Sequence, residues 1–359
     1  MSSTFLRISP RLLAVFTAAG VLILITLATA PAALSTDLPG ASPDTGRKAI
    51  VPARPVHTYS IVARDPATGQ IGVAVQSHWF SVGSIVTWAE AGVGAVATQS
   101  FVRVEYGPEG LALMKEGIAA PDALSRLVEA DEGRDVRQVA MIDAKGRISA
   151  HTGERCIQAA GHRVGVNYSV QANLMLDTGV WPAMAQAFES AQGDLAERML
   201  VSLEAAQAMG GDIRGKQSAA ILIVKGESTG KPWNDRVLEL RIEDHPEPIK
   251  ELRRLVLMWR AYEEMNAGDY AVEKNDITAA IRHYSAAEAM IPGMHEFIFW
   301  HAATLAQQGR VEESLPLFSR AFRLQPAWLL LVPRLPASDL LPDDEKIIER
   351  ILAVGPEGK

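Results

Sequence analysis

The residues between 57 and 245 constrain the fold most, because β-rich runs and helical runs follow one another in blocks. The runs "TYSIVAR" and "IGVAVQS" flank "DPATGQ", whose Asp, Pro and Gly favour a turn, so residues 58–77 are predicted to form a hairpin. "SIVTWAEAGVGAVATQS" adds two strand-like stretches that bend at Gly92 and Gly94. The domain is therefore expected to begin with several neighbouring strands.

Two helical blocks interrupt these strands. Residues 108–130 carry apolar residues at helical spacing and break at 117–121, and residues 178–209 predict a second helix pair that is split near Gly193. Between them lie a hairpin that turns at 143–146 and the strand-like run "VNYSVQANLML". "SAAILIVKG" and "RVLELRIED" are predicted to be the closing strands. This order predicts an α+β fold, in which two sheets pack together with helices outside them.

Residues 246–359 change to a helical pattern in which two stretches align with a period of 34. The aligned positions are Gly268, Ala280, Tyr284, Ala287 and Pro292, which match Ala302, Ser314, Phe318, Ala321 and Pro326. Small residues where paired helices touch, and a closing proline, resemble tetratricopeptide repeats; a short pair of helical hairpins is the alternative. Because two repeats fall short of a stable array, a helix over 248–261 is expected to cap them and pack on the first domain.

The first 34 residues predict a signal peptide or a membrane anchor. Arg7 and Arg11 precede an apolar run from Leu12 to about Ala30, which small residues follow. The run is long enough to span a bilayer, so an uncleaved anchor is the alternative to export and cleavage. Residues 35–56 are rich in Pro, Gly, Ser and Asp and are expected to be a linker. We therefore expect an exported protein, periplasmic or extracellular, that contacts the membrane only through an uncleaved N-terminal segment.

Charge and cysteine content exclude several classes of function. The net charge of −7 includes no basic block, so nucleic acid is not an expected partner. The single cysteine, Cys156, excludes an intramolecular disulfide framework and a cysteine-rich zinc site. His151, His162, Asp244 and His245 match no ligand spacing, so neither a metal nor another cofactor is expected.

The block over 57–245 resembles the αββα sandwich of N-terminal-nucleophile hydrolases. It resembles more closely a family in that superfamily, called domain of unknown function 1028. The stretches that carry the resemblance are "TYSIVARDPATGQIGVAVQSHWFSVG", "AGVGAVATQS", "YSVQAN" and "GGDIRGKQSAAILIV". The resemblance implies a four-layer sandwich and hydrolysis of amide bonds by a nucleophile that opens the first strand.

Thr58 is the candidate nucleophile. A threonine hydroxyl needs a base beside it, and a free α-amine on the same residue, with a pKa of about 8, can take the proton. The mechanism therefore requires a cut at the His57–Thr58 bond, and in this superfamily such cuts are commonly autocatalytic. The alternative is that Thr58 is a β-branched residue suited to the start of a strand. Ser60 is a second candidate, because it lies two residues on, on the same strand face.

Polar residues at other strand ends complete the expected site. Ser77 and His78 lie at the end of the second strand and in the loop after it and could hold the nucleophile or substrate; the alternative for His78 is an exposed loop histidine. Gln99 and Asn173 also end strand-like runs. Their side-chain amides could bind a substrate amide or an oxyanion, and the alternative for Asn173 is a turn cap.

Asp212 and Arg214 lie in the turn that enters a buried strand, "GGDIRGKQSAA". They could form an ion pair that fixes the loop, or Arg214 could bind a substrate carboxylate with two hydrogen bonds. Only the second alternative makes these residues part of a substrate site.

Together these features favour an exported amide-bond hydrolase that acts on a small peptide or an acylated amine. The competing hypothesis is a non-catalytic binding module whose helical repeats present a concave face to a protein or peptide. It is favoured by the intact upstream segment. It is also favoured because no lysine lies between Arg64 and Met114, where proteasome-like members of the superfamily often place one. Assembly into a homo-oligomer is compatible with either hypothesis.

Overall fold

The computed structural model of the chain describes residue 56 and residues 58–356. The expected signal or anchor, the linker apart from Val56, and His57 lie outside the described residues. No helix in the described part has the length and apolarity needed to cross a membrane.

A six-stranded antiparallel sheet forms the centre of the first domain, as counted over the described residues. Its strands, in spatial order, are β10 (Arg236–Ile242), β9 (Ser218–Val224), β2 (Ile71–Ser77), β1 (Thr58–Arg64), β8 (Tyr168–Ala172) and β7 (Gly161–Gly165). The predicted β1/β2 hairpin is confirmed, with Thr58 opposite Ser77. Sequence reasoning missed β7, because this edge strand is polar and largely exposed and so has no apolar pattern.

A second antiparallel sheet packs face to face against the first. Its strands are β3 (Thr87–Glu90), β4 (Gly94–Ser100), β5 (Arg137–Asp143) and β6 (Ile148–Thr152), with a short helix α1 (Gly83–Val86) before β3 and a 3-10 turn η1 (Arg134–Val136) before β5. Alternate residues of each strand point between the sheets, where Val62 and Val73 of the first sheet pack with Ala97 and Ala140 of the second.

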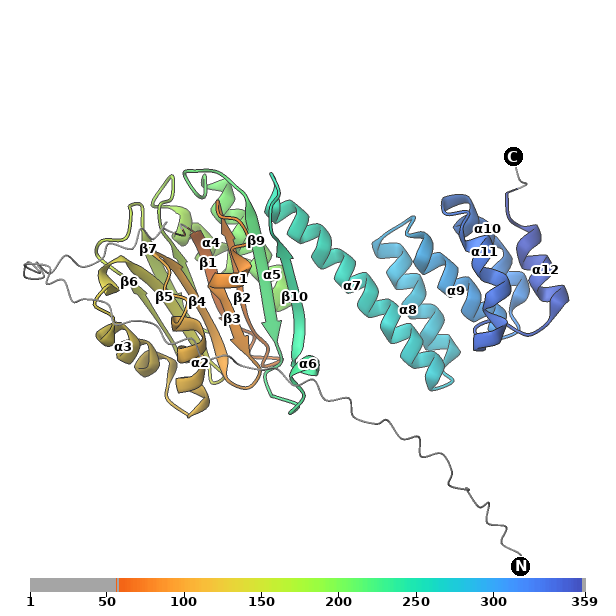
Figure 1. Ribbon diagram of the computed structural model, residues 1–359, viewed down its shortest axis with the longest axis horizontal. Helices are drawn as coiled ribbons and strands as arrows, with labels where there is room; N and C mark the ends of the chain where they lie inside the picture. The colour runs from red at the N-terminus through yellow and green to blue at the C-terminus, as the bar shows by residue number, and fades with distance from the viewer. Residues whose placement is uncertain (1–55, 57, 357–359) are drawn as a thin grey trace, which may run out of the picture. The chain divides into compact units, whose positions relative to one another are not determined.

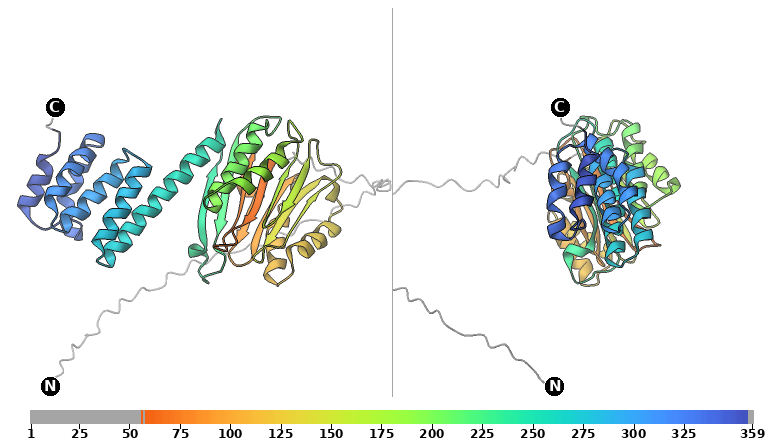
Figure 2. Two further views of the ribbon diagram at one scale, coloured as in Figure 1. Left: turned by 180° about the vertical axis from the view of Figure 1, so that it is seen from behind. Right: turned by 90° about the vertical axis from the view of Figure 1, so that its right-hand side faces the viewer.

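Helices cover the outer faces of both sheets (Figure 1). α4 (Val180–Ser190) and α5 (Leu195–Ala208) pack on the six-stranded sheet, as the view from behind in Figure 2 shows. α2 (Tyr106–Lys115) and α3 (Ala120–Ala130) pack on the four-stranded sheet, and α6 (Pro232–Asp235) precedes β10. The order is therefore helices, sheet, sheet, helices. The predicted α+β class and its four layers are confirmed.

The helix α7 (Pro248–Glu273) differs from the expectation of a separate capping helix over 248–261. It runs for 26 residues without a break, since the only proline it contains is at its first position, where proline is tolerated. Its first half buries Ile249, Leu252 and Val256 in the core beneath the six-stranded sheet. Its second half pairs with the next helix, α8 (Ile277–Met290). One helix thus serves both as the expected cap and as the first helix of the repeat region.

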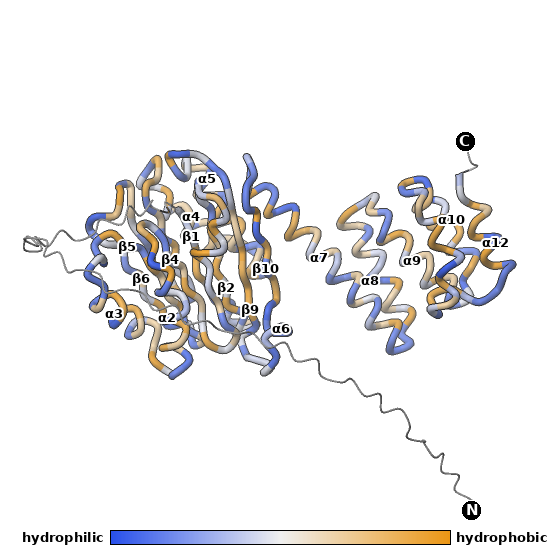
Figure 3. Tube along the Cα trace, viewed as in Figure 1, coloured by the Kyte–Doolittle hydropathy of each residue, from blue (hydrophilic) through white to orange (hydrophobic). Residues whose placement is uncertain are grey.

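The remaining helices continue this pairing. They are α9 (His295–Gln307), α10 (Val311–Leu324), α11 (Trp328–Leu331) and α12 (Glu345–Ala353), with 3-10 turns η2 (Val332–Arg334) and η3 (Pro336–Ser338). The two aligned stretches fold as the helix pairs α7/α8 and α9/α10. Hydrophobic and hydrophilic residues alternate along these helices in Figure 3, as expected for helices that bury one side.

Gly268 marks the closest approach of α7 and α8. A β-carbon at this position would lie 2.3 Å from Cε1 of Tyr284, whose ring is fully buried. Helix propensity alone predicts that Gly268→Ala stabilises α7 by about 1 kcal/mol. We expect the opposite, a loss of about 1–3 kcal/mol in unfolding free energy, because the buried ring would have to shift from its packed position and from its hydrogen bond to Asp269. Urea unfolding tests this, with Glu263→Ala on the exposed side of α7 as the control. A gain in stability would contradict it.

Candidate functional site

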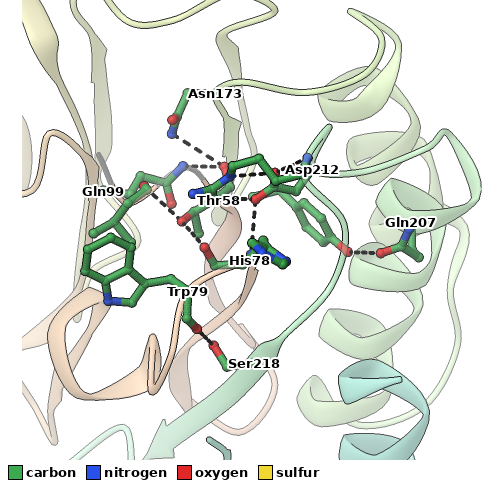
Figure 4. Close-up of polar contacts among 12 residues, drawn as sticks. Thr58, His78, Trp79, Gln99, Asn173, Gln207, Asp212 and Ser218 are labelled. Carbon is green, nitrogen blue, oxygen red and sulfur yellow. Dashed lines mark hydrogen bonds and ion pairs between the residues drawn. The ribbon is translucent and has the colours of Figure 1, made fainter. Parts of the chain in front are cut away.

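Thr58 lies at the first position of β1, with its side chain between the two sheets (Figure 4). It has no exposed surface. Its hydroxyl donates to the carbonyl oxygen of Val56 at 3.0 Å and lies 3.1 Å from Oγ of Ser77, its partner across the hairpin. In the described part of the chain these are the hydrogen-bond partners of the hydroxyl. Neither of them is a histidine, lysine or carboxylate that could act as a general base.

The chain upstream of Thr58 is tied to the other sheet. Val56 forms an isolated antiparallel bridge with Ser100, at the end of β4, through two backbone hydrogen bonds of 2.6 and 2.9 Å. Val56 is itself fully buried. The residue two positions before the candidate nucleophile is therefore part of the core in the uncut chain.

A network of buried amides surrounds Thr58. Gln99 of β4 donates from Nε2 to Oε1 of Gln138 at 2.6 Å and to the carbonyl oxygen of Thr58 at 3.1 Å. The Ser60 hydroxyl donates to Gln99 Oε1 and accepts from Gln171 Nε2, both at 2.6 Å. These side chains are fully buried, so each hydrogen bond avoids the cost of an unpaired polar group. The network joins the two sheets directly behind the candidate nucleophile.

Asn173 completes this network from the residue after β8. Its backbone N–H donates to the Thr58 carbonyl oxygen at 3.1 Å, and its side-chain Nδ2 donates to Gln138 Oε1 at 2.9 Å. The same Nδ2 lies 3.5 Å from the Thr58 carbonyl oxygen. Asn173 therefore fixes the backbone of Thr58 and places an amide donor next to it.

Gln138 is the residue of this network that sequence reasoning missed. It accepts from Gln99 and Asn173, and its Nε2 donates across the sandwich to the carbonyl oxygen of Ala172 at 2.9 Å. A signal was present in "RQVAMID", because Gln138 shares the inward-facing positions of β5 with Ala140 and Ile142. A glutamine on an otherwise apolar strand face needs buried partners.

Asp212, Arg214 and His78 form a neighbouring loop cluster rather than part of the amide network. Figure 4 shows Asp212 next to His78. The buried Asp212 carboxylate accepts from the backbone N–H of His78 at 3.1 Å and from Arg214 Nη2 at 2.7 Å and Nε at 3.0 Å. This geometry matches the alternative in which the pair fixes the loop. The His78 side chain is exposed.

Further polar contacts hold the same loops against the sheet (Figure 4). The Ser218 hydroxyl donates to the carbonyl oxygen of Trp79, and the Tyr59 hydroxyl donates to Gln207 Oε1 at 3.0 Å. Complete burial, with a smaller contribution from the charge of Asp212, raises the pKa of Tyr59 well above its usual value, so this phenol stays protonated. Ser218 thus ties the loop after β2 to β9, and Tyr59 ties β1 to α5.

The fold and this arrangement can be compared with known proteins. The profile of the family of unknown function DUF1028 matches residues 58–252. The chain belongs to this family. A crystal structure of a DUF1028 protein from Silicibacter pomeroyi is similar, with 30% sequence identity and a TM-score of 0.51, over 60% of this chain and 92% of that chain. A search of curated proteins finds no match.

Within this DUF1028 protein, the structure brings together five of the eight residues that the sequence singled out. They are Thr58, Ser60, Ser77, Gln99 and Asn173. The other three, His78, Asp212 and Arg214, lie in loops at the same end of the sandwich. The family match starts at Thr58 and ends inside α7, so α8 to α12 lie outside it.

Proposed function

We propose that this DUF1028 protein is an exported amide-bond hydrolase that becomes active when its chain is cut between His57 and Thr58. The observation that carries the proposal is the Thr58 hydroxyl, which is buried at the start of β1, paired with Ser77, and without a basic side chain beside it among the described residues. A nucleophile in this setting needs its own α-amine as the base. The family match that begins at Thr58 also supports it.

The proposed reaction has two steps. The free α-amine of Thr58 accepts the hydroxyl proton while Oγ1 attacks the carbonyl carbon of the substrate amide. The carbon–nitrogen bond then breaks, the departing amine takes this proton, and the acyl group remains on Oγ1 as an ester. Water hydrolyses the ester, releasing a carboxylic acid and restoring the hydroxyl. Because amine and hydroxyl belong to one residue, their separation is fixed before any substrate binds.

Asn173 is the proposed oxyanion donor. Gln138 accepts one of its side-chain amide hydrogens at 2.9 Å, whereas the contact of the same Nδ2 with the Thr58 carbonyl oxygen is long, at 3.5 Å, so the second amide hydrogen can be given to an oxyanion. A donor held in position before the reaction stabilises the tetrahedral intermediate without a cost of reorganisation. Gln99 is proposed to hold the nucleophile rather than the substrate, because both of its amide hydrogens are used within the network.

The loops near Thr58 favour a substrate with an apolar group. Phe80, Leu176 and Ile213 are 64%, 61% and 56% exposed, and each follows shortly after a strand end or turn at this end of the sandwich. Leu176 and Ile213 belong to loops that are hydrogen-bonded to each other. Exposed apolar side chains near a site commonly contact ligands. A small apolar peptide or acylated amine fits this surrounding.

A non-catalytic binding module is the second candidate. Two observations favour it. Thr58 is completely buried, and the bridge between Val56 and Ser100 makes the segment before Thr58 part of the core, so the uncut chain packs without cleavage. In this reading the helix pairs α7/α8 and α9/α10, which we propose to be tetratricopeptide-like, would carry the function.

Intact mass and N-terminal sequencing of the protein, purified from its native host, distinguish the two. The hydrolase proposal expects a chain that begins at Thr58. A chain that begins upstream and keeps the His57–Thr58 bond leaves no free amine, and it would overturn the hydrolase in favour of the binding module.

A further inference from the structure

A cavity of about 500 Å³ opens between helices α7, α8 and α9 and residues 339–340. Aromatic side chains line it, among them Tyr262, Phe297 and Trp300. Tyr262 stands edge-on to Phe297, with ring centroids 4.9 Å apart, which keeps its ring fixed at the opening. We call this cavity the acidic groove, because all the charged residues that line it are acidic. Its residues lie C-terminal to residue 252, outside the part of the chain that the family profile matches.

The charged residues that line the acidic groove are all of one sign. They are Asp269, Glu273, Glu296 and Asp339, and no lysine, arginine or histidine lines the cavity. Within the described part of the chain, none of these four carboxylates forms a salt bridge. By contrast, acidic residues elsewhere on α5, α7 and α10 do pair with arginines, as Glu197, Glu251 and Glu313 do. The groove thus has negative charge that the chain leaves unbalanced.

Tyrosine hydroxyls orient two of these carboxylates. Tyr262 donates to Glu296 at 2.7 Å and Tyr284 donates to Asp269 at 2.8 Å. The hydrogen bond to Glu296 raises the pKa of Tyr262 to about 12, so the phenol remains a donor at neutral pH. Each carboxylate keeps further acceptor sites for a ligand.

The groove also offers amide groups. Asn266, Gln307 and Gln308 line it beside the carboxylates. Side-chain amides can both donate to and accept from a peptide backbone. Aromatic faces bind the methylene stems and the cationic heads of lysine and arginine. Carboxylates, amides and aromatic rings in one cavity match an extended basic peptide better than an isolated cation.

We propose that the acidic groove binds a segment of another protein that carries lysine or arginine side chains. The partner's cations would face Asp269, Glu273 and Asp339, and its backbone would face the amides. This proposal is independent of the chemistry at Thr58, because every residue that lines the groove lies C-terminal to the family match.

The test uses the full chain and a short fluorescent peptide of alternating lysine and serine, with the same peptide carrying glutamate as its counterpart. Fluorescence anisotropy is expected to show binding of the lysine peptide alone. The triple variant Asp269→Asn, Glu273→Gln and Asp339→Asn is expected to weaken binding about tenfold, since each exposed charge pair contributes a fraction of a kcal/mol.

The control variant removes the same charge elsewhere, through Glu116→Gln, Glu154→Gln and Glu227→Gln, which are exposed and do not line the groove. Binding within about twofold of the wild type supports a specific groove. Equal losses in the two triple variants would show attraction by net charge alone and overturn the proposal. Equal binding of the glutamate peptide, or no binding of the lysine peptide, would also overturn it.

Two other molecules or segments could occupy the acidic groove, and separate measurements identify each of them. The segment over 35–56 carries Arg47, Lys48 and Arg54, so the chain could fill its own groove. Tighter binding of the lysine peptide after Arg47→Ser, Lys48→Ser and Arg54→Ser would identify that segment as the occupant. A wild type that is dimeric by sedimentation, with a monomeric groove variant, would identify a second copy. Either result would overturn the proposal of an external partner.

Discussion

The Thr58→Ala chain is expected to keep its upstream segment and to have lost hydrolysis of any amide substrate by several orders of magnitude. In the proposed mechanism the Thr58 hydroxyl attacks the His57 carbonyl carbon, the His57–Thr58 amide bond breaks to give an ester, and water hydrolyses the ester to free the amine and the hydroxyl. The same hydroxyl then attacks the substrate, and alanine removes it. The fold should survive, because the change removes one buried hydroxyl and one methyl group from the end of β1. Intact mass reports the cut, and covalent labelling by a β-lactone reports the activated nucleophile.

Thr58→Ser is the matched comparison. Serine retains a hydroxyl within reach of Ser77 and Val56, so the cut and the labelling should persist at a reduced rate. Thr278→Ala, an exposed substitution on α8, controls for handling of the variants. A Thr58→Ala chain that is still cut before residue 58 would show that another protease makes the cut. Labelling of that chain would remove Thr58 from the mechanism.

The Gln138→Leu chain is expected to lose about 3 kcal/mol of unfolding free energy. Leucine fills a similar volume but leaves the Gln99 and Asn173 amides without their shared acceptor, and removes the Gln138 donor from the Ala172 carbonyl oxygen. Each buried polar group left unpaired costs about 1–3 kcal/mol, and partial relaxation keeps the sum near the lower end. Urea unfolding at constant pH measures this loss.

Gln186→Leu provides the control, since Gln186 lies on the exposed side of α4 and its side chain is outside the network. Its effect is expected to stay within about 0.5 kcal/mol. If Gln138→Leu is equally neutral, the amides behind Thr58 do not hold the two sheets together. The geometry of the candidate site would then need another support.

The sequence predicted the strands and helices well where one side of an element is apolar. β1, β2, β4 and β9 have long buried runs, and the breaks near 117–121 and Gly193 separate the helix pairs as expected. Sequence patterns did not predict elements that lack one continuous apolar side. β7 is an exposed edge strand, and the continuity of α7 depends on the packing of its middle turns against two different neighbours.

The site was partly predictable for a similar reason. The facing pair Thr58 and Ser77 follows from the hairpin, because both residues lie at equal distances from its turn. The contact of Thr58 with Gln99 and of Asn173 with Gln138 joins different sheets, and strand patterns do not specify how two sheets register. Gln138 was missed for this reason, although it is the acceptor that the other amides share.

The long helix α7 connects the first domain to the C-terminal helices. The family match ends at residue 252, only a few residues into a helix that continues to Glu273. The C-terminal helices are therefore connected to the first domain by a continuous helix and not by a loop. Leu252, which packs in the first domain, and Met265 and Gly268, which pack in the helical region, lie on this one helix. A peptide bound in the acidic groove would contact the same helix whose first half packs in the core beneath the six-stranded sheet.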